Sequence, residues 1–144
     1  MSQKDVDEIL RKYKTVAIVG LSRDPAKDSH KVGEYLKSQG FRIVPINPFV
    51  DEVLGEKSYE SLLNMPVEEQ RGIEIVDVFR PAVDVPLIVG QTIRLKKLYD
   101  VPHVVWMQIG IVNEEAANEA RKAGLSVIMD KCLMREHRRI IGES

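Results

Sequence analysis

The stretch VAIVGLSRDPAKDSHKVG (Val16–Gly33) decides the fold, because it joins a buried strand to a helix through one glycine. It continues the β-branched run Thr15–Val19, which is typical of a strand buried on both faces. Gly20 then permits a tight turn, and a helix is predicted from an N-cap at Ser29 to a stop at Gly40. A strand buried on both faces needs helices over it, so this stretch predicts an α/β fold.

The rest of the chain repeats the alternation of strands and helices. Further strands are predicted over residues 42–47, 73–79, 103–107 and 126–129. Helices are predicted near residues 5–13, 58–63, 84–98, 114–123 and 133–140, with Asp84 and Asn113 as caps. This alternation implies right-handed crossovers and a parallel sheet. We therefore predict a single Rossmann-like domain over residues 1–144, a doubly wound, three-layer structure whose five strands follow the order 3-2-1-4-5.

Composition and charge exclude several classes of protein. A net charge of -1 gives no overall attraction to nucleic acid or to a membrane surface, so any anion site must be local. No apolar run has the length of a membrane span, and the start MSQKDVDEIL lacks the apolar core of a signal peptide. One cysteine allows neither an internal disulfide nor a cysteine-rich zinc cluster, and the 3 histidines have no metal-binding spacing. We expect a cytoplasmic protein without a metal.

Each predicted strand is followed by an unusual segment. These segments are GLSRDPAKDSHK, NP (Asn47, Pro48), RP (Arg80, Pro81), QIGI (Gln108–Ile111) and DKC (Asp130–Cys132). The carboxyl ends of parallel strands share one edge of the sheet, where ligands bind in open α/β folds. Polar residues are ordinary in any single loop, but five such loops at one edge favour an elongated ligand that crosses it.

The first loop has the composition of a phosphate site. Gly20 lets the backbone approach a ligand, and a helix start with the hydroxyls of Ser22 and Ser29 would supply hydrogen-bond donors. Positive charge comes from Arg23, Lys27, His30 and Lys31. A solvated surface loop has similar residues, so this pattern alone leaves both interpretations open.

The same region argues against a nicotinamide dinucleotide. The three closely spaced glycines of a dehydrogenase fingerprint are absent. Asn47 stands at the end of the second strand, where NAD-binding proteins usually place an acidic residue that holds the ribose hydroxyls. An amide tolerates a phosphorylated ribose, which favours a different nucleotide.

Cys132 directly precedes the last predicted helix, so that its sulfur lies at the helix N-terminus and at the same edge of the sheet. A lone cysteine is usually a small buried hydrophobe. At a helix N-terminus, however, positive partial charge favours a thiolate, and Lys131 and Arg135 lie nearby in sequence. A reactive thiol is therefore the alternative, and a stable disulfide would require another molecule.

With these features the chain resembles the small, single-domain CoA-binding protein family. That family shares its fold with the N-terminal CoA-binding domain of succinyl-CoA synthetase alpha subunits. The matching blocks, in family order, are VAIVGLSRDPAKDSHKVGEYL, GFRIVPINP, LGEKSYESL, IEIVDVFRP and VVWMQIGIVNEEAANEARKAGLSVIMDKCLMREHRR.

The resemblance implies that coenzyme A lies across the strand ends. The residues it places at the diphosphate are Gly20, Leu21 and Ser22, with phosphate contacts from Arg23, Lys27, Ser29 and Lys31. Those it places beside the nucleotide are Asn47, Pro48, Val78, Phe79 and Arg80. Along the pantetheine arm it places Gln108, Ile109 and Gly110, with the thiol reaching toward Cys132.

Three functions that use a bound nucleotide are compatible with these residues, and a protein-interaction scaffold with a vestigial pocket is a further alternative. The first is a non-catalytic protein that binds CoA or an acyl-CoA and forms a redox-sensitive mixed disulfide between CoA and Cys132. The second is a detached subunit of an acyl-CoA ligase or transferase, which would act with a separate catalytic chain because the synthetase's second domain is not matched. The third and least favoured is an NAD(P)-dependent oxidoreductase.

Overall fold

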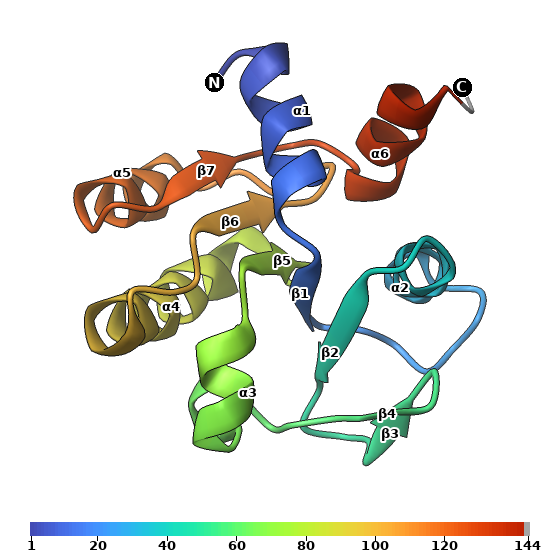
Figure 1. The fold of residues 1–144 in the computed structure, drawn as a ribbon. Coiled ribbons are helices and arrows are strands. Elements are labelled where there is room, and N and C mark those ends of the chain that lie inside the picture. Colours follow the sequence, from blue (N-terminus) through green and yellow to red (C-terminus); the bar gives the residue numbers. More distant parts are fainter. Residues whose placement is uncertain (143–144) are drawn as a thin grey trace.

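A five-stranded parallel sheet carries the fold (Figure 1). In this computed structural model, which describes residues 1–142, the strands follow the order β2-β1-β5-β6-β7. Their bounds are β1 (Thr15–Val19), β2 (Arg42–Ile46), β5 (Ile75–Val78), β6 (Val104–Met107) and β7 (Ser126–Ile128). The predicted Rossmann-like α/β class is confirmed.

Helices cover both faces of the sheet. One face packs against α1 (Gln3–Lys12), α2 (Asp28–Ser38) and α6 (Leu133–Ile141). The other face packs against α4 (Val85–Tyr99) and α5 (Glu114–Lys122). The smaller elements are β3 (Glu52–Val53), β4 (Glu56–Lys57), the 3-10 turns η1 (Leu62–Asn64) and η2 (Ala82–Asp84), and α3 (Val67–Gly72).

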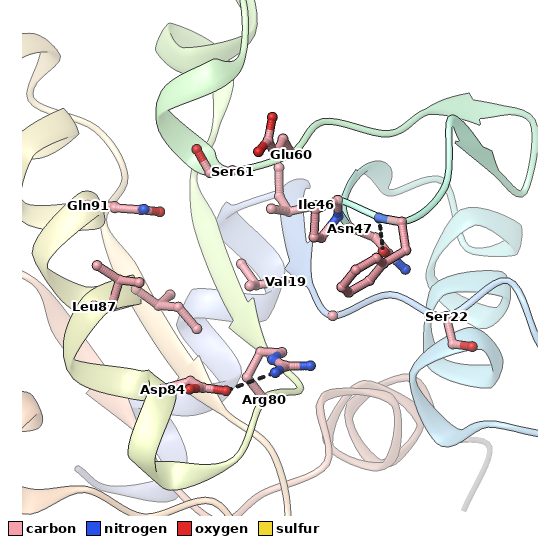
Figure 2. A pocket seen from close by; sticks show the side chains of 14 residues that line it. Val19, Ser22, Ile46, Asn47, Glu60, Ser61, Arg80, Asp84, Leu87 and Gln91 are labelled. Carbon is pink, nitrogen blue, oxygen red and sulfur yellow. Dashed lines mark hydrogen bonds and ion pairs between the residues drawn. The ribbon is translucent and has the colours of Figure 1, made fainter.

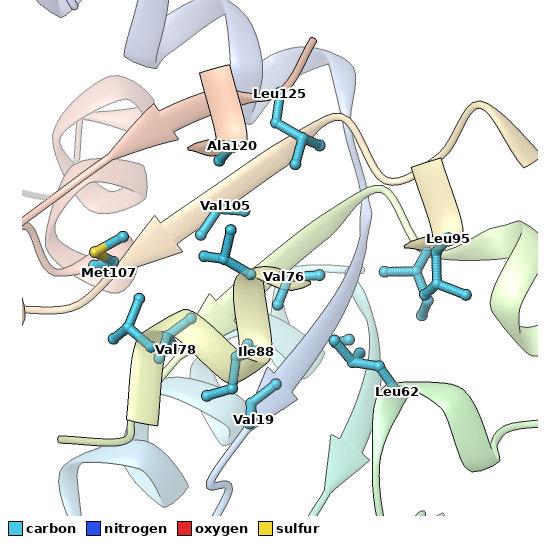
Figure 3. Packing of buried hydrophobic residues seen from close by; sticks show 14 of the residues in the cluster. Val19, Leu62, Val76, Val78, Ile88, Leu95, Val105, Met107, Ala120 and Leu125 are labelled. Atoms are coloured by element: carbon cyan, nitrogen blue, oxygen red, sulfur yellow. The ribbon is translucent and has the colours of Figure 1, made fainter. Parts of the chain in front are cut away.

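Side chains of each strand alternate between the two cores. Along β1, Val16 and Ile18 pack toward α2, whereas Ala17 and Val19 pack toward α4. Figure 3 shows the α4 side, where Val19, Val76 and Val105 from three neighbouring strands meet Ile88. Burial on both faces explains why these strands are continuous apolar runs rather than alternating ones.

The predicted strand order is wrong in one respect. The third main strand, β5, pairs with β1 (Val16↔Ile75) and not with β2, so the five strands follow the order 2-1-3-4-5. The outer side of β2 is occupied by Tyr59, which donates its N–H to the Pro45 carbonyl (3.1 Å) and accepts from the Asn47 N–H (2.9 Å). Tyr59 thus forms a single bridge where the prediction placed a whole strand. The chain then passes to the other side of β1, where β5 pairs with it.

Most element boundaries agree with the prediction within two residues. The helix α2 begins at Asp28 with Lys27 at its N-cap, so Ser29 is not the cap. Asn113 caps α5 as predicted, accepting from the Ala116 N–H at 3.0 Å. The helix predicted at 58–63 is only the 3-10 turn η1, and α3 was not predicted. In the described part of the chain, no helix combines the length and apolar character needed to span a membrane.

Candidate functional site at the carboxyl edge of the sheet

The candidate site lies where β1 and β5 end side by side. The chain leaves β1 toward α2 on one face of the sheet and leaves β5 toward α4 on the other. Such a reversal opens a crevice at the carboxyl ends of the strands, and ligands of open α/β sheets bind there.

Gly20 sets how closely the two strand ends approach each other. Its N–H donates to the Ile46 carbonyl at 2.9 Å, and its φ of +91° is a conformation that residues with a side chain rarely adopt. A Cβ at this position would lie 2.9 Å from the Phe79 carbonyl oxygen and 3.1 Å from Cδ of Arg80. A glycine is therefore required by the backbone turn and by the neighbouring strand end.

A cavity of about 520 Å³ opens on the α4 side of this crossing; we call it the Arg80 cavity (Figure 2). Its apolar floor includes Val19, Ile46 and Ile88. Arg80 reaches its rim and forms an ion pair with Asp84 (2.9 Å). The remaining lining residues are Gly20, Ser22, Asn47, Pro48, Phe49, Glu60, Ser61, Leu87 and Gln91.

A second cavity of about 210 Å³ opens on the α2 and α6 side; we call it the Cys132 cavity. Strand ends contribute Phe79, Gln108 and Ile109, with Ile111 beside them. The first turns of two helices contribute Asp28, Lys31 and Val32 from α2, and Met134 and Arg135 from α6, with Cys132 at the N-cap of α6. Neither helix has a side-chain cap, so N–H groups of both first turns are left without that partner.

Hydrogen bonds within the first loop use several groups that the sequence assigns to phosphate. The Ser22 N–H donates to Oγ of Ser29 (2.9 Å), and Oγ of Ser22 accepts from the Asp24 N–H (3.0 Å). Nδ1 of His30 donates to the Ser22 carbonyl (2.8 Å). The two serines therefore hold the shape of the loop.

The side chain of Asn47 joins the loops that follow β1 and β2. Its Nδ2 donates to the Leu21 carbonyl (3.0 Å), and its Oδ1 accepts from the Phe49 N–H (2.9 Å). These bonds use both ends of the amide and fix the backbone of Phe49, a residue that is 88% exposed and lines the Arg80 cavity.

The structure divides the predicted residues among three environments. The Arg80 cavity receives Gly20, Ser22, Asn47, Pro48 and Arg80, and the Cys132 cavity receives Lys31, Phe79, Gln108, Ile109 and Cys132. The residues that line neither cavity are Leu21, Arg23, Lys27, Ser29, Val78 and Gly110. Leu21 and Val78 are fully buried in the two cores, so a ligand at the edge cannot contact their side chains. Their predicted places beside the diphosphate and the nucleotide stay predictions.

Several residues that line the Arg80 cavity were not predicted from the sequence. The first turns of α4 bring Leu87 and Gln91 to the Arg80 cavity, and their helical spacing of four residues was a usable signal. Glu60 and Ser61 follow the single bridge at Tyr59, which no strand pattern announces.

Asp77 was also missed, although it is a charged residue within the apolar run IEIVDVF. It is fully buried on β5, and Gln108 Nε2 donates to its Oδ1 at 2.6 Å. Within residues 1–142 its Oδ2 has no hydrogen-bond partner. Burial raises the pKa of Asp77 to about 7, against the lowering effect of the Gln108 hydrogen bond.

No group of three or more histidine, cysteine, aspartate or glutamate side chains in the described residues could hold a metal ion. The site therefore consists of backbone amides, cationic side chains, two cavities and one thiol. Such groups can bind an anionic, elongated ligand with an apolar part.

Comparisons with known proteins identify one protein family over most of the chain. Residues 14–138 match the protein family described as CoA binding domain. The Bacillus subtilis protein YneT is 38% identical over 136 residues, which make up 94% of each chain. The solved structure of a hypothetical protein from Pyrococcus horikoshii is 38% identical with a TM-score of 0.88, over 99% of this chain and 94% of that one.

A longer relative matches only in part. The ADP-forming acetate–CoA ligase II of Archaeoglobus fulgidus is 36% identical over 80 residues, which are 54% of this chain and 11% of the ligase. The chain thus matches about a tenth of that enzyme.

Proposed function

We propose, since the chain belongs to the CoA binding domain family, that it binds coenzyme A across the carboxyl edge of its sheet without itself catalysing a reaction. We take residues 1–144 to act as one domain. The observation that carries the proposal is the pair of cavities on opposite faces of the sheet, which are lined by the consecutive residues Arg80 and Phe79 beside Gly20. A long ligand with a nucleotide at one end and a thiol at the other fits this arrangement.

In this proposal the adenosine end occupies the Arg80 cavity. Ligand pockets usually measure roughly 300–1,000 Å³, a range that includes the 520 Å³ of this cavity. Its apolar floor of Val19, Ile46 and Ile88 suits a base, while the guanidinium of Arg80 suits a phosphate.

The diphosphate would cross at Gly20 and Ser22 and face the uncapped N-terminus of α2. Arg23, Lys27 and Lys31 stand in this region, and none of them forms an ion pair within residues 1–142. Free cations and free N–H groups favour a ligand that carries several phosphates. The smaller Cys132 cavity would then take the pantetheine arm.

A titration with CoA, NAD and NADP at one ionic strength tests the proposal. We expect CoA to bind in preference to both dinucleotides, and Arg80→Gln to weaken CoA binding about tenfold by removing a charged hydrogen-bond donor. Arg121→Gln is the matched control, because Arg121 lies on α5 and, among residues 1–142, bonds only to Asn118. Absence of CoA binding, or a preference for NAD, would overturn the proposal.

The proposal extends to a mixed disulfide between CoA and Cys132. Cys132 is a free, partly exposed thiol on the cavity assigned to the pantetheine arm. With CoA disulfide as oxidant, the Cys132 thiolate attacks one sulfur of that disulfide. The new protein–CoA disulfide forms, the old sulfur–sulfur bond breaks, and one CoA thiolate leaves.

Intact mass spectrometry tests this extension. After incubation with CoA disulfide we expect a mass increase equal to bound CoA, which reductant removes and which Cys132→Ser lacks. An unchanged mass in the wild-type protein would contradict the mixed disulfide, but not non-covalent CoA binding.

A second candidate function rests on the match to the acetate–CoA ligase. In that case the chain would present CoA to a separate catalytic chain. Formation of ATP from acetyl-CoA, ADP and phosphate by a complex purified through this chain, but not by the chain alone, would favour the ligase subunit.

A further inference from the structure

Asp77 and Gln108 form a polar pair beneath the Cys132 cavity. Asp77 lies between Ile18 of β1 and Trp106 of β6 in the sheet register, so its neighbours along the sheet are apolar. Gln108 follows β6 directly, is 4% exposed and lines the Cys132 cavity. The pair thus connects the buried interior of the sheet to the surface of the cavity.

The carboxyl group of Asp77 is costly to the fold. Its only hydrogen bond is the 2.6 Å contact from Gln108, and its Oδ2 has no partner in the described residues. The titratable groups of the helices packed on this face are Asp28, His30, Lys31, Glu34, Tyr35 and Lys37 on α2, Arg135, Glu136, His137, Arg138 and Arg139 on α6 with Cys132 at its N-cap, and Lys4, Asp5, Asp7, Glu8, Arg11 and Lys12 on α1. None of these groups is an ion-pair or hydrogen-bond partner of Asp77. A buried, poorly compensated carboxyl destabilises a protein. A gain in ligand binding would explain why an aspartate occupies this position.

The hydrogen bond fixes which end of Gln108 faces the cavity. An ionised carboxylate can only accept hydrogen bonds, so it holds the Gln108 Nε2 toward Asp77. The side-chain oxygen of Gln108 is then left for the cavity, and within residues 1–142 it accepts no hydrogen bond. A protonated carboxyl could instead donate to that oxygen and allow the amide to turn around.

We propose that Asp77 is a positioning residue, which holds the side-chain oxygen of Gln108 toward the Cys132 cavity to accept a hydrogen bond from an amide N–H of the pantetheine arm. The inference rests on the proposed function, because it requires that arm in this cavity. It assigns Asp77 a role in ligand selection, which accounts for the presence of a carboxyl group that destabilises the fold.

The test compares CoA with adenosine 3′,5′-bisphosphate, a fragment that lacks the pantetheine arm. In Gln108→Leu we expect CoA binding to weaken roughly 3- to 10-fold, as for one lost hydrogen bond, while binding of the bisphosphate stays unchanged. Gln39→Leu makes the same substitution at the exposed C-cap of α2, outside both cavities, and serves as the control. Equal weakening of both ligands, or no weakening of CoA, would overturn the inference.

A pH series separates positioning from a purely structural role. In the wild type, CoA binding should strengthen as Asp77 ionises between about pH 6 and 8, whereas Asp77→Asn should lack this part of the pH dependence. The ligand's own phosphates titrate equally with both proteins, so the difference between the two profiles belongs to Asp77. Identical profiles would overturn the inference and leave CoA binding intact; failure of the wild type to bind CoA at any pH would overturn the proposed function as well.

Discussion

At the scale of single residues, Gly20 makes the crossing between β1 and β5 possible. An alanine there would adopt an unfavourable φ and place its Cβ 2.9 Å from the Phe79 carbonyl oxygen. We predict that Gly20→Ala lowers the free energy of unfolding, measured in urea, by about 1–2 kcal/mol for the left-handed backbone and by at least about 1 kcal/mol more for the close contact.

Gly40→Ala supplies the matched control for this prediction. Gly40 has a φ of +87°, but a Cβ there would meet no atom within 4 Å. It should therefore show only the backbone part of the loss, about 1–2 kcal/mol. Equal losses in the two variants would contradict the steric role of Gly20.

Asp77 should make stability depend on pH. Its pKa is raised from 3.8 to about 7 in the folded protein, so between these values the folded state holds a proton that the unfolded state has released. The free energy of unfolding should consequently fall as pH rises from about 4 to about 7 and then level off. Urea unfolding at pH 5 and pH 8 should show this fall in the wild type and a smaller one in Asp77→Asn. A variant that lost as much stability as the wild type over this interval would contradict the assignment.

Individual residues also mark the limit of sequence reasoning. The polar edge residues were recognised because each follows a predicted strand, a purely local signal. The same signal does not say which way a side chain points, and the side chains of Leu21 and Val78 are buried. The Asp77–Gln108 pair joins residues 31 positions apart, and only the alignment of β5 with β6 brings them together.

At the scale of elements, the loops after β1 and β2 are held as one unit by Asn47. Replacing Asn47 by alanine removes the bonds to the Leu21 carbonyl and the Phe49 N–H. We predict a loss of about 1–3 kcal/mol in the free energy of unfolding, together with faster hydrogen exchange at Phe49. Asn64→Ala, which breaks an exposed contact with Ser61, should change little. Slow exchange at Phe49 in the Asn47 variant would show that other contacts hold the loop.

The elements show why fold class was predictable and strand order was not. Apolar strands and capped helices such as α5 are local patterns, and the sequence contains them in full. The position of β5 depends on how residues 47–74 cross the sheet. That path includes one bridge at Tyr59 and the short hairpin β3–β4. Both are too short to produce the apolar pattern from which a strand is predicted.

At the scale of the whole molecule, the two cavities belong to different faces of one sheet. The Arg80 cavity borders the core under α4, and the Cys132 cavity borders the core under α2 and α6. Consecutive residues, Phe79 and Arg80, line opposite cavities. A ligand that spans the edge would therefore contact both cavities, whereas a fragment of it would occupy only one cavity.

The contrast between a ligand that contacts both cavities and a fragment that occupies one predicts how ligands protect Cys132 from alkylation. CoA and adenosine 3′,5′-bisphosphate should both raise the melting temperature, because any ligand of the folded state stabilises it by mass action. Only CoA should slow the alkylation of Cys132 by iodoacetamide, since in the proposed function only its pantetheine arm would reach the Cys132 cavity. Each ligand is used at a concentration that gives the same rise in melting temperature, so that general stabilisation is matched. Equal protection by the bisphosphate would mean that Cys132 is shielded by a change in the whole protein, and the pantetheine arm would then have to be placed elsewhere.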